Sequence, residues 1–156
     1  QVQAIGFIHE QLSHSDDVST IAVGNYLRSV VDSALAFRPD IDVALDYVVE
    51  DLPLPTKRAV SLGLIANELM TNALKHAFAA EESPRARVLL ETDSESGGYR
   101  FSISHNGTGL PEDIDTAGET SLGLRLVRAL AQQLGAEMRI HRDPETTFEL
   151  LIPPAG

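Results

Sequence analysis

The chain has 156 residues, of which 43% are hydrophobic and 22% are charged, as expected for one packed domain. It has no Cys, which excludes disulfide bonds, thiolate metal sites and Cys nucleophiles. The 12 Lys and Arg residues against 23 Asp and Glu residues give a formal net charge of −11, which argues against nucleic acid or an anionic membrane surface as a partner.

We expect neither a membrane span nor a secretory signal peptide in this sequence. No apolar run reaches the length of a membrane span, and Gln1–His9 has neither the basic start nor the cleavage site of a secretory signal. We therefore expect a cytoplasmic location and no membrane contact in this fragment. Because the chain starts at Gln1 rather than Met, we expect a fragment or a processed product.

The hydrophobic pattern predicts a mixture of helices and strands. In chain order we predict a helix over Gln1–Leu12, a loop over Ser13–Ser19, a helix over Ile21–Phe37, a strand over Ile41–Val49, a Pro-rich turn over Leu52–Pro55, a long helix over Thr56–Phe78, a loop over Ala79–Arg85, strands over Ala86–Glu91 and Tyr99–Ser104, a loop over Asn106–Ser121, a helix over Leu122–Leu134, and strands over Glu137–His141 and Thr147–Ile152. Pro39 ends the second helix, Thr56 caps the third and Gly135 closes the last. This order predicts a two-layer α/β sandwich, with a mixed, mostly antiparallel sheet covered by helices, and disfavours a Rossmann-type sheet.

The most informative stretch is LGLIANELMTNALKHAF over Leu62–Phe78. On a helix that turns about 100° per residue, Asn72 falls about 40° from Glu68. Lys75 and His76 fall at about −20° and about 80° on the same scale. One carboxylate, one carboxamide, one ammonium and one imidazole on a single face suit a site for Mg²⁺ and phosphate. A solvated face of an amphipathic helix explains the same spacing.

Two further stretches contain glycine, the first just after a predicted strand and the second at the start of a predicted helix. In SHNGTGLP, over Ser104–Pro111, Gly107 and Gly109 allow positive φ and a close approach of the backbone to a ligand. In SLGLRLVRALAQQ, over Ser121–Gln133, a helix N-terminus presents free backbone N–H groups that attract phosphate. An ordinary turn and an ordinary helix start explain each stretch when it is taken alone.

Together and in this order, the three stretches resemble the ATP-binding domain of sensor histidine kinases, in the wider Bergerat-fold (GHKL) superfamily. NELMTNALKH is similar to the N box, HNGTGLP to the G1 box, and SLGLRLV to the G2 box of members with a short ATP lid. TTFELLIP resembles the closing strand, and VQAIGFIHEQL resembles the end of the second helix of the dimerisation and phosphoacceptor module. The HWE subgroup expects a Trp, which this chain lacks, so the related subgroup that shares its N-box His fits better.

The resemblance implies roles for the polar side chains of the N box. Glu68 is the catalytic carboxylate, acting as a base or an orienting group near the γ-phosphate. Asn72 coordinates Mg²⁺, and Lys75 and His76 contact the phosphates of ATP.

The resemblance also implies roles for residues beyond the N box. The further residues expected to bind the nucleotide are His105, Gly107, Gly109, Ser121, Leu122, Gly123 and Thr146. The glycines of the G1 box let the backbone pass the adenine, the start of the last helix lies by the phosphates, and Thr146 stands near the adenine. Arg125 and Arg128 follow on that helix, and the sequence does not decide which of them adds positive charge.

Two positions depart from the family pattern. His105 stands where the G1 box has an Asp that accepts a hydrogen bond from the adenine amino group. A neutral imidazole accepts that bond in one tautomer, and a protonated imidazole has no acceptor. We therefore expect weakened ATP binding, or its loss. Glu145 replaces the usual Gly before Thr146, which puts the backbone course near the adenine in question.

We predict that residues 1–14 are the end of a helical dimerisation and phosphoacceptor module and that residues 15–156 are the ATP-binding catalytic domain. The implied function is transfer of the γ-phosphoryl group of ATP to a His on a separate or missing helix, because His9 does not match the phosphoacceptor position. The implied partners are this module's helices and a response-regulator receiver domain. One alternative is a degenerate kinase-like domain that serves as a phosphotransfer or docking scaffold, and another is an anti-sigma-type Ser/Thr kinase.

Overall fold

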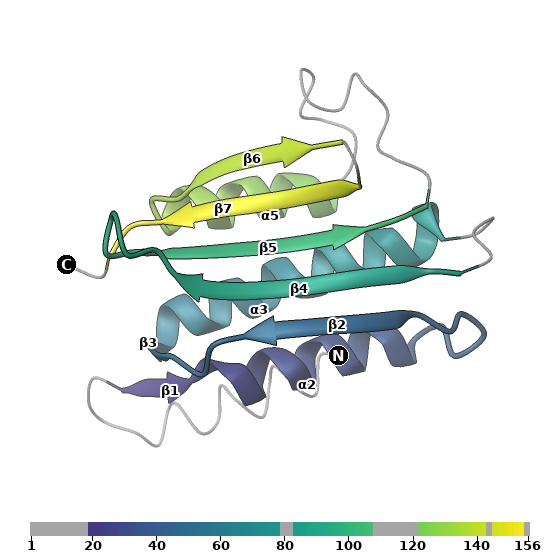
Figure 1. The fold of residues 1–156 in the computed structure, drawn as a ribbon, viewed down its shortest axis with the longest axis horizontal. Helices are drawn as coiled ribbons and strands as arrows, with labels where there is room; N and C mark the ends of the chain where they lie inside the picture. The colour runs from purple at the N-terminus through teal and green to yellow at the C-terminus, as the bar shows by residue number, and fades with distance from the viewer. Residues whose placement is uncertain (1–18, 79–82, 108–121, 143–144, 155–156) are drawn as a thin grey trace.

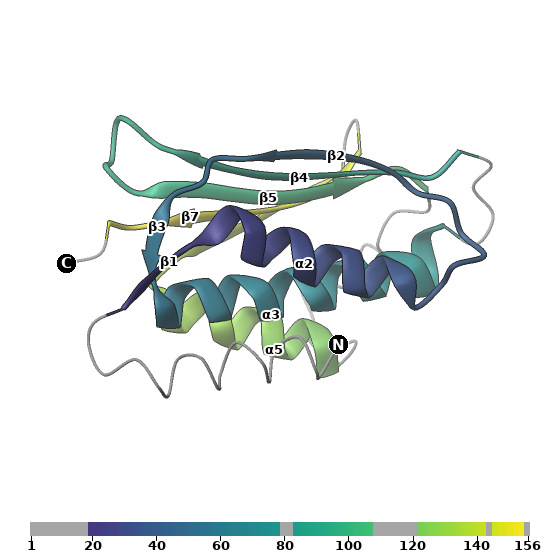
Figure 2. The same cartoon turned by 90° about the horizontal axis from the view of Figure 1, so that it is seen from below.

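The computed structural model describes residues 19–78, 83–107, 122–142 and 145–154, and its helices and strands form two layers (Figures 1 and 2). The helices are α2 (Val23–Ala36), α3 (Thr56–Asn72) with a π-helical turn η1 (Ala73–Ala77) after it, and α5 (Leu122–Gln133). The strands of the large sheet are β2 (Ala44–Val49), β4 (Arg85–Thr92), β5 (Tyr99–His105), β6 (Glu137–His141) and β7 (Thr146–Ile152). None of the helices in these ranges is both long and apolar enough to cross a bilayer.

The large sheet has five strands in the order β2-β4-β5-β7-β6. β2 and β4 run parallel, and the other neighbours are antiparallel. Figure 2 shows the helices α2, α3 and α5 on one side of this sheet. We call the other side the outer face. This two-layer α/β sandwich, with its mixed and mostly antiparallel sheet, confirms the predicted fold class.

The core lies between the helices and the sheet. Alternate residues of the strands point into it, as the period of two along a strand requires. Fully buried side chains come from both layers, among them Leu27, Leu62, Ile65, Met70, Val88, Leu90, Phe101 and Ile103. Gly63 brings α2 and α3 together, because a Cβ at this position would lie 2.6 Å from the Tyr26 hydroxyl oxygen.

The segment before α3 differs from the prediction. The expected Pro-rich turn contains strand β3 (Pro53–Pro55), which pairs antiparallel with β1 (Thr20–Ala22). A two-stranded ribbon tolerates proline at its edges. The prediction that Thr56 caps the helix was wrong, because the N-cap is Pro55 and no side chain caps the helix. The Thr56 hydroxyl instead donates to the Ser19 carbonyl oxygen at 3.0 Å, which ties the ribbon to the helix start.

The other predicted boundaries differ by a few residues from the observed ones. The strand expected from Ile41 begins at Ala44, where the N–H of Ala44 bonds to the Pro84 carbonyl oxygen at 2.9 Å. Gly135 has a φ of 68° just after α5, as predicted for a residue that closes a helix. The helix predicted over Gln1–Leu12 lies outside the described residues.

Candidate functional site

The candidate site begins where β5 ends beside the start of β7. His105 and Thr146 are the buried polar side chains of the described chain, with 6% and 4% of their surface exposed. The two residues are partners in the β5–β7 ladder. The His105 ring meets the ring of Phe78 edge to face, with the centroids 5.7 Å apart. The end of the long helical segment therefore lies against a buried imidazole at the end of the sheet.

The tautomer of His105 follows from its hydrogen bond. Its Nδ1 lies 2.9 Å from the backbone carbonyl oxygen of Asn106. Because a carbonyl oxygen only accepts, Nδ1 carries the hydrogen, and Nε2 is the acceptor nitrogen of the neutral ring. Burial lowers the pKa of His105, although the hydrogen bond to Asn106 and the charge of Glu145 act in the opposite direction. His105 is therefore neutral at pH 7.

Asn106 holds this end of the sheet together, and sequence reasoning did not find it. Its Oδ1 accepts the backbone N–H of Arg85 at 2.7 Å, and its Nδ2 donates to the Ser83 carbonyl oxygen at 2.9 Å. Its own N–H donates to the Arg85 carbonyl oxygen at 3.2 Å. These bonds fix the carbonyl group that orients His105. The available signal was an Asn at a strand end before a Gly, where its side chain often replaces a backbone partner.

Gly107 packs against the end of the π-helical turn. Its φ is +95°, and a Cβ at this position would collide with the carbonyl oxygen of Ala77. A glycine is therefore needed here for an approach between two parts of the chain itself. This contact joins the start of the glycine-rich stretch to the end of the N-box-like helix.

The polar residues of the long helical segment are arranged differently from the prediction. Glu68 and Asn72 lie half-buried on the last turn of α3, whereas Lys75 and His76 are exposed on η1. A π-turn holds more residues than an α-turn, so later side chains fall behind the α-helical spacing. Around the helix axis, His76 therefore lies closer to the direction of Asn72 than the α-helical spacing predicts, and Lys75 lies farther from it. π-turns often occur at functional sites.

Several predicted site residues are only partly described. Gly109 and Ser121 lie outside the described residues. Leu122 and Gly123 begin α5, as predicted. On the same helix Arg125 is exposed, whereas Arg128 has a buried Nε that finds no hydrogen-bond partner among the described residues.

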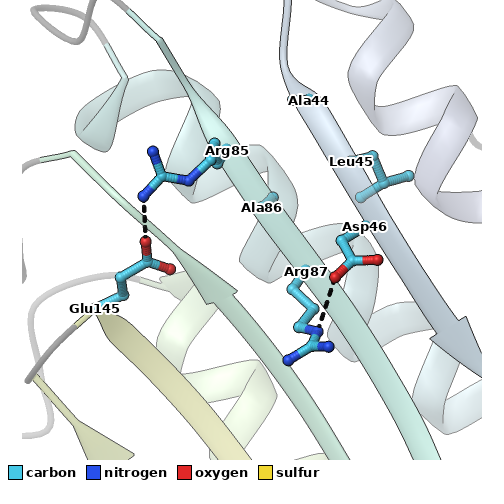
Figure 3. A pocket seen from close by; sticks show the side chains of 7 residues that line it. All are labelled: Ala44, Leu45, Asp46, Arg85, Ala86, Arg87 and Glu145. Atoms are coloured by element: carbon cyan, nitrogen blue, oxygen red, sulfur yellow. Dashed lines mark hydrogen bonds and ion pairs between the residues drawn. The ribbon is translucent and has the colours of Figure 1, made fainter.

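Glu145 lies on the outer face, opposite to Thr146 in the alternation of the strand. Its carboxylate accepts from Nη2 of Arg85 at 2.7 Å, and Arg87 and Asp46 make a second pair at 3.0 Å (Figure 3). An open pocket on this face is lined by Ala44, Leu45, Asp46, Arg85, Ala86, Arg87 and Glu145. Because Thr146 stays buried on the helix side, Glu145 does not displace it from the position next to His105.

Comparisons with known proteins identify the family to which the chain belongs. The family model described as "Histidine kinase-, DNA gyrase B-, and HSP90-like ATPase" matches residues 57–156, and a model described as "Histidine kinase" matches residues 1–37. Blue-light-activated histidine kinase 2 of Erythrobacter litoralis is 29% identical over 147 residues, covering 91% of this chain and 42% of that protein. Sensor histidine kinase PdtaS of Mycobacterium tuberculosis is 29% identical over 166 residues, covering 98% of this chain and 31% of that protein.

Two solved structures of histidine kinases have a similar fold. The histidine kinase domain of the E. litoralis EL346 blue-light-activated kinase has a TM-score of 0.84 and 27% identity, and the match covers 97% of this chain and 72% of that one. The ATP-binding domain of PrrB from M. tuberculosis shares the fold, with a TM-score of 0.69 and 24% identity, over 90% of this chain and all of that one. The chain spans less than half the length of the two curated relatives named above. It belongs to the histidine kinase-, DNA gyrase B- and HSP90-like ATPase family, as a histidine kinase catalytic domain.

Proposed function

We propose that this domain binds Mg-ATP and transfers its γ-phosphoryl group to a His on a helical phosphoacceptor module. The observation that carries the proposal is the meeting of two features at one end of the sandwich. The polar residues Glu68 and Asn72 of α3 and Lys75 and His76 of η1 come shortly before Phe78, which contacts the buried His105. A nucleotide site needs polar groups that bind the phosphates and polar groups that bind the nucleobase. The polar residues of α3 and η1 suit the phosphates, and the buried pair of His105 and Thr146 suits the nucleobase.

Glu68 and Asn72 serve the γ-phosphate in this proposal. Glu68 takes the catalytic role, as a base or by orienting the accepting His. Lys75 and His76 extend from η1 toward the phosphates, and the exposed ammonium of Lys75 offsets part of the negative charge of a chain with net charge −11. Catalysis is then mainly positioning and charge neutralisation, as in phosphoryl transfer generally.

Asn72 fits a shared Mg²⁺ site better than a site built by protein alone. The described residues contain no group of three His, Asp or Glu side chains that could hold a metal ion by themselves. Mg²⁺ commonly takes one or two protein oxygens and completes its shell with substrate phosphates and water. Asn72, with Glu68 one turn away, offers such oxygens, and the ion supplies charge neutralisation of the phosphates.

His105 and Thr146 hold the adenine in this proposal. A buried polar pair costs folding free energy unless a partner satisfies it, and a base edge is a partner of the right size. Gly107 and Gly109 contact the base in this proposal. Ser121, Leu122 and Gly123 bind the phosphates in this proposal, because backbone N–H groups at the N-terminus of a helix favour an anion.

The wider setting of the domain is also a proposal. We place the domain boundary after residue 14, and we place the accepting His on dimerisation helices that pair with this domain. A response-regulator receiver domain then takes the phosphoryl group in the cytoplasm. The comparisons do not favour a degenerate scaffold, because the relatives named above are kinases.

A trans-phosphorylation assay tests the proposal. The chain is incubated with Mg²⁺, γ-labelled ATP and the phosphoacceptor helices of a histidine kinase of this type. We expect acid-labile label on the acceptor, lost in Asn72→Ala and retained in Asn25→Ala, whose Asn is exposed on α2. Acid-stable label would indicate a Ser/Thr kinase, and absence of label with every acceptor would contradict the proposal.

A further inference from the structure

We propose that His105 selects the base of the nucleotide and that its protonation inverts the selection. This inference rests on the proposed nucleotide site and adds a specificity and a regulation to it. In the neutral state His105 favours a base that offers an amino group. In the protonated state it favours a base that offers a carbonyl oxygen at the same position.

The geometry fixes what His105 offers to a ligand. The carbonyl oxygen of Asn106 takes the hydrogen of Nδ1 at 2.9 Å, so the neutral ring presents an acceptor at Nε2. Adenine carries an exocyclic amino group, which donates to an acceptor. Guanine and hypoxanthine carry a carbonyl oxygen in its place, which an acceptor repels. A buried site that leaves such a group unpaired discriminates strongly against the wrong ligand.

Protonation changes the sign of this preference. The added proton sits on Nε2, because Nδ1 already carries its hydrogen. The imidazolium then has two donors and no acceptor. It opposes the amino group of adenine and donates to the carbonyl oxygen of hypoxanthine.

The neighbours of His105 allow this switch to operate. Its ladder partners are Ala86 on β4 and Thr146 on β7, and Phe78 packs on it from the helical layer. None of these three side chains titrates.

The charged side chains near His105 do not pack on its ring but lie on the outer face or are exposed on η1. The negative charge of Glu145, on the outer face, raises the pKa of His105, and Arg85 pairs with that carboxylate at 2.7 Å. Arg87 pairs with Asp46 on the same face, and Lys75 and His76 are exposed on η1. Burial lowers the pKa of His105, so the switch lies on the acid side of about pH 6.5.

Binding of Mg-ATP and Mg-ITP to the chain tests the inference. ITP carries a carbonyl oxygen in place of the amino group of ATP and a hydrogen on the neighbouring ring nitrogen N1. Its phosphates titrate in the same way as those of ATP, so their effect cancels in a ratio. Affinities are measured by calorimetry from about pH 8 down to about pH 5. We expect ATP to bind more tightly at the upper end. The ratio of ATP to ITP affinity should then fall by up to about tenfold per pH unit once His105 protonates.

Two variants serve as controls. His105→Asp replaces the imidazole with a carboxyl group, which keeps an acceptor oxygen in both of its protonation states, so its ratio should change much less with pH. His141→Gln removes an exposed His on the outer face and should leave the pH dependence of the ratio intact. A ratio in the unmodified chain as flat as that in His105→Asp would overturn the inference alone. Absence of binding by both nucleotides in the chain and in His105→Asp would overturn the proposed function, and the inference with it.

Nitrogen NMR of the His105 ring supplies a test without nucleotide. At neutral pH we expect a protonated Nδ1 and an unprotonated Nε2. The opposite tautomer would contradict the inference even if the chain binds ATP.

Discussion

On the outer face of the sheet, charged side chains form exposed ion pairs, such as that of Arg87 and Asp46 at 3.0 Å. On the helix side, His105 and Thr146 are buried among apolar neighbours. An exposed ion pair contributes little to stability and needs no further explanation. A buried imidazole costs free energy, and such groups gather at functional sites. The same sheet therefore carries ordinary surface chemistry on one face and the candidate site at one end of the other.

The largest expected effect is on the rate of phosphoryl transfer, and it distinguishes a carboxylate of the candidate site from a carboxylate of the outer face. Glu68→Gln should lower the rate of phosphoryl transfer on the order of 100-fold, because the positioned carboxylate is lost while the side-chain volume is kept. Glu91→Gln, on the outer face, should leave the rate unchanged. Single-turnover labelling with γ-labelled ATP measures both rates, and equal rates in the two variants would remove Glu68 from the chemistry.

The next effect concerns the junction between the sheet end and η1. Gly107→Ala should lower the free energy of unfolding by about 2 kcal/mol or more, because it adds a collision with the Ala77 carbonyl oxygen to the cost of a positive φ. Gly97→Ala is the matched control, since Gly97 has a φ of +78° and no atom near the position of the added Cβ. This control should cost only about 1 kcal/mol. Urea unfolding compares the two, and equal losses would contradict the close approach.

A smaller effect concerns the pH dependence of stability. The folded-state pKa of His105 lies below its unfolded value, so the unfolded chain binds the proton first as the pH falls. Stability should be full above about pH 6.5 and decrease below it, until the pH reaches the folded-state pKa. The slope contributed by His105 should be at most about 1.4 kcal/mol per pH unit.

His105→Gln should remove this slope, because it deletes the group that titrates. His141→Gln, which changes an exposed His, should retain it. Unfolding curves across the pH range measure both, and a slope that survives in His105→Gln would show that another group causes it.

The smallest effect is expected on the outer face. Arg85 and Glu145 are 58% and 33% exposed, although their atoms approach to 2.7 Å. A double-mutant cycle with Arg85→Ala and Glu145→Gln should give a coupling of less than about 1 kcal/mol, because water and salt screen the pair. A coupling free energy well above this value would mean that this ion pair on the outer face contributes substantially to stability.

The sequence was sufficient to predict the fold class and most element positions, and it supplied the segments that we propose for the site. Apolar periodicity located α2, α3 and α5, since it reports burial directly. It did not reveal the π-turn at Ala73–Ala77, because one extra residue in a turn leaves no mark on so short a pattern. It also missed the β1–β3 ribbon, which joins segments about 30 residues apart by backbone bonds.

Within the site, sequence reasoning identified His105 but left its tautomer open. The tautomer depends on where the Asn106 carbonyl points, and that direction is set by bonds to Arg85 and Ser83 from another part of the chain. The effect of Glu145 was also open, because only the strand pairing places its side chain on the outer face. Residue types can thus be read from the sequence, whereas the direction of a side chain comes from tertiary contacts.

Calorimetric titration of Mg-ATP into the chain, into Asn72→Ala and into His105→Asp tests the central claim, that the polar residues of α3 and η1 and the buried His105 form one nucleotide site. We predict binding to the unmodified chain, weakened at least about tenfold in Asn72→Ala and strengthened in His105→Asp. Failure of the unmodified chain and of His105→Asp to bind would contradict the claim. So would an affinity that Asn72→Ala leaves unchanged.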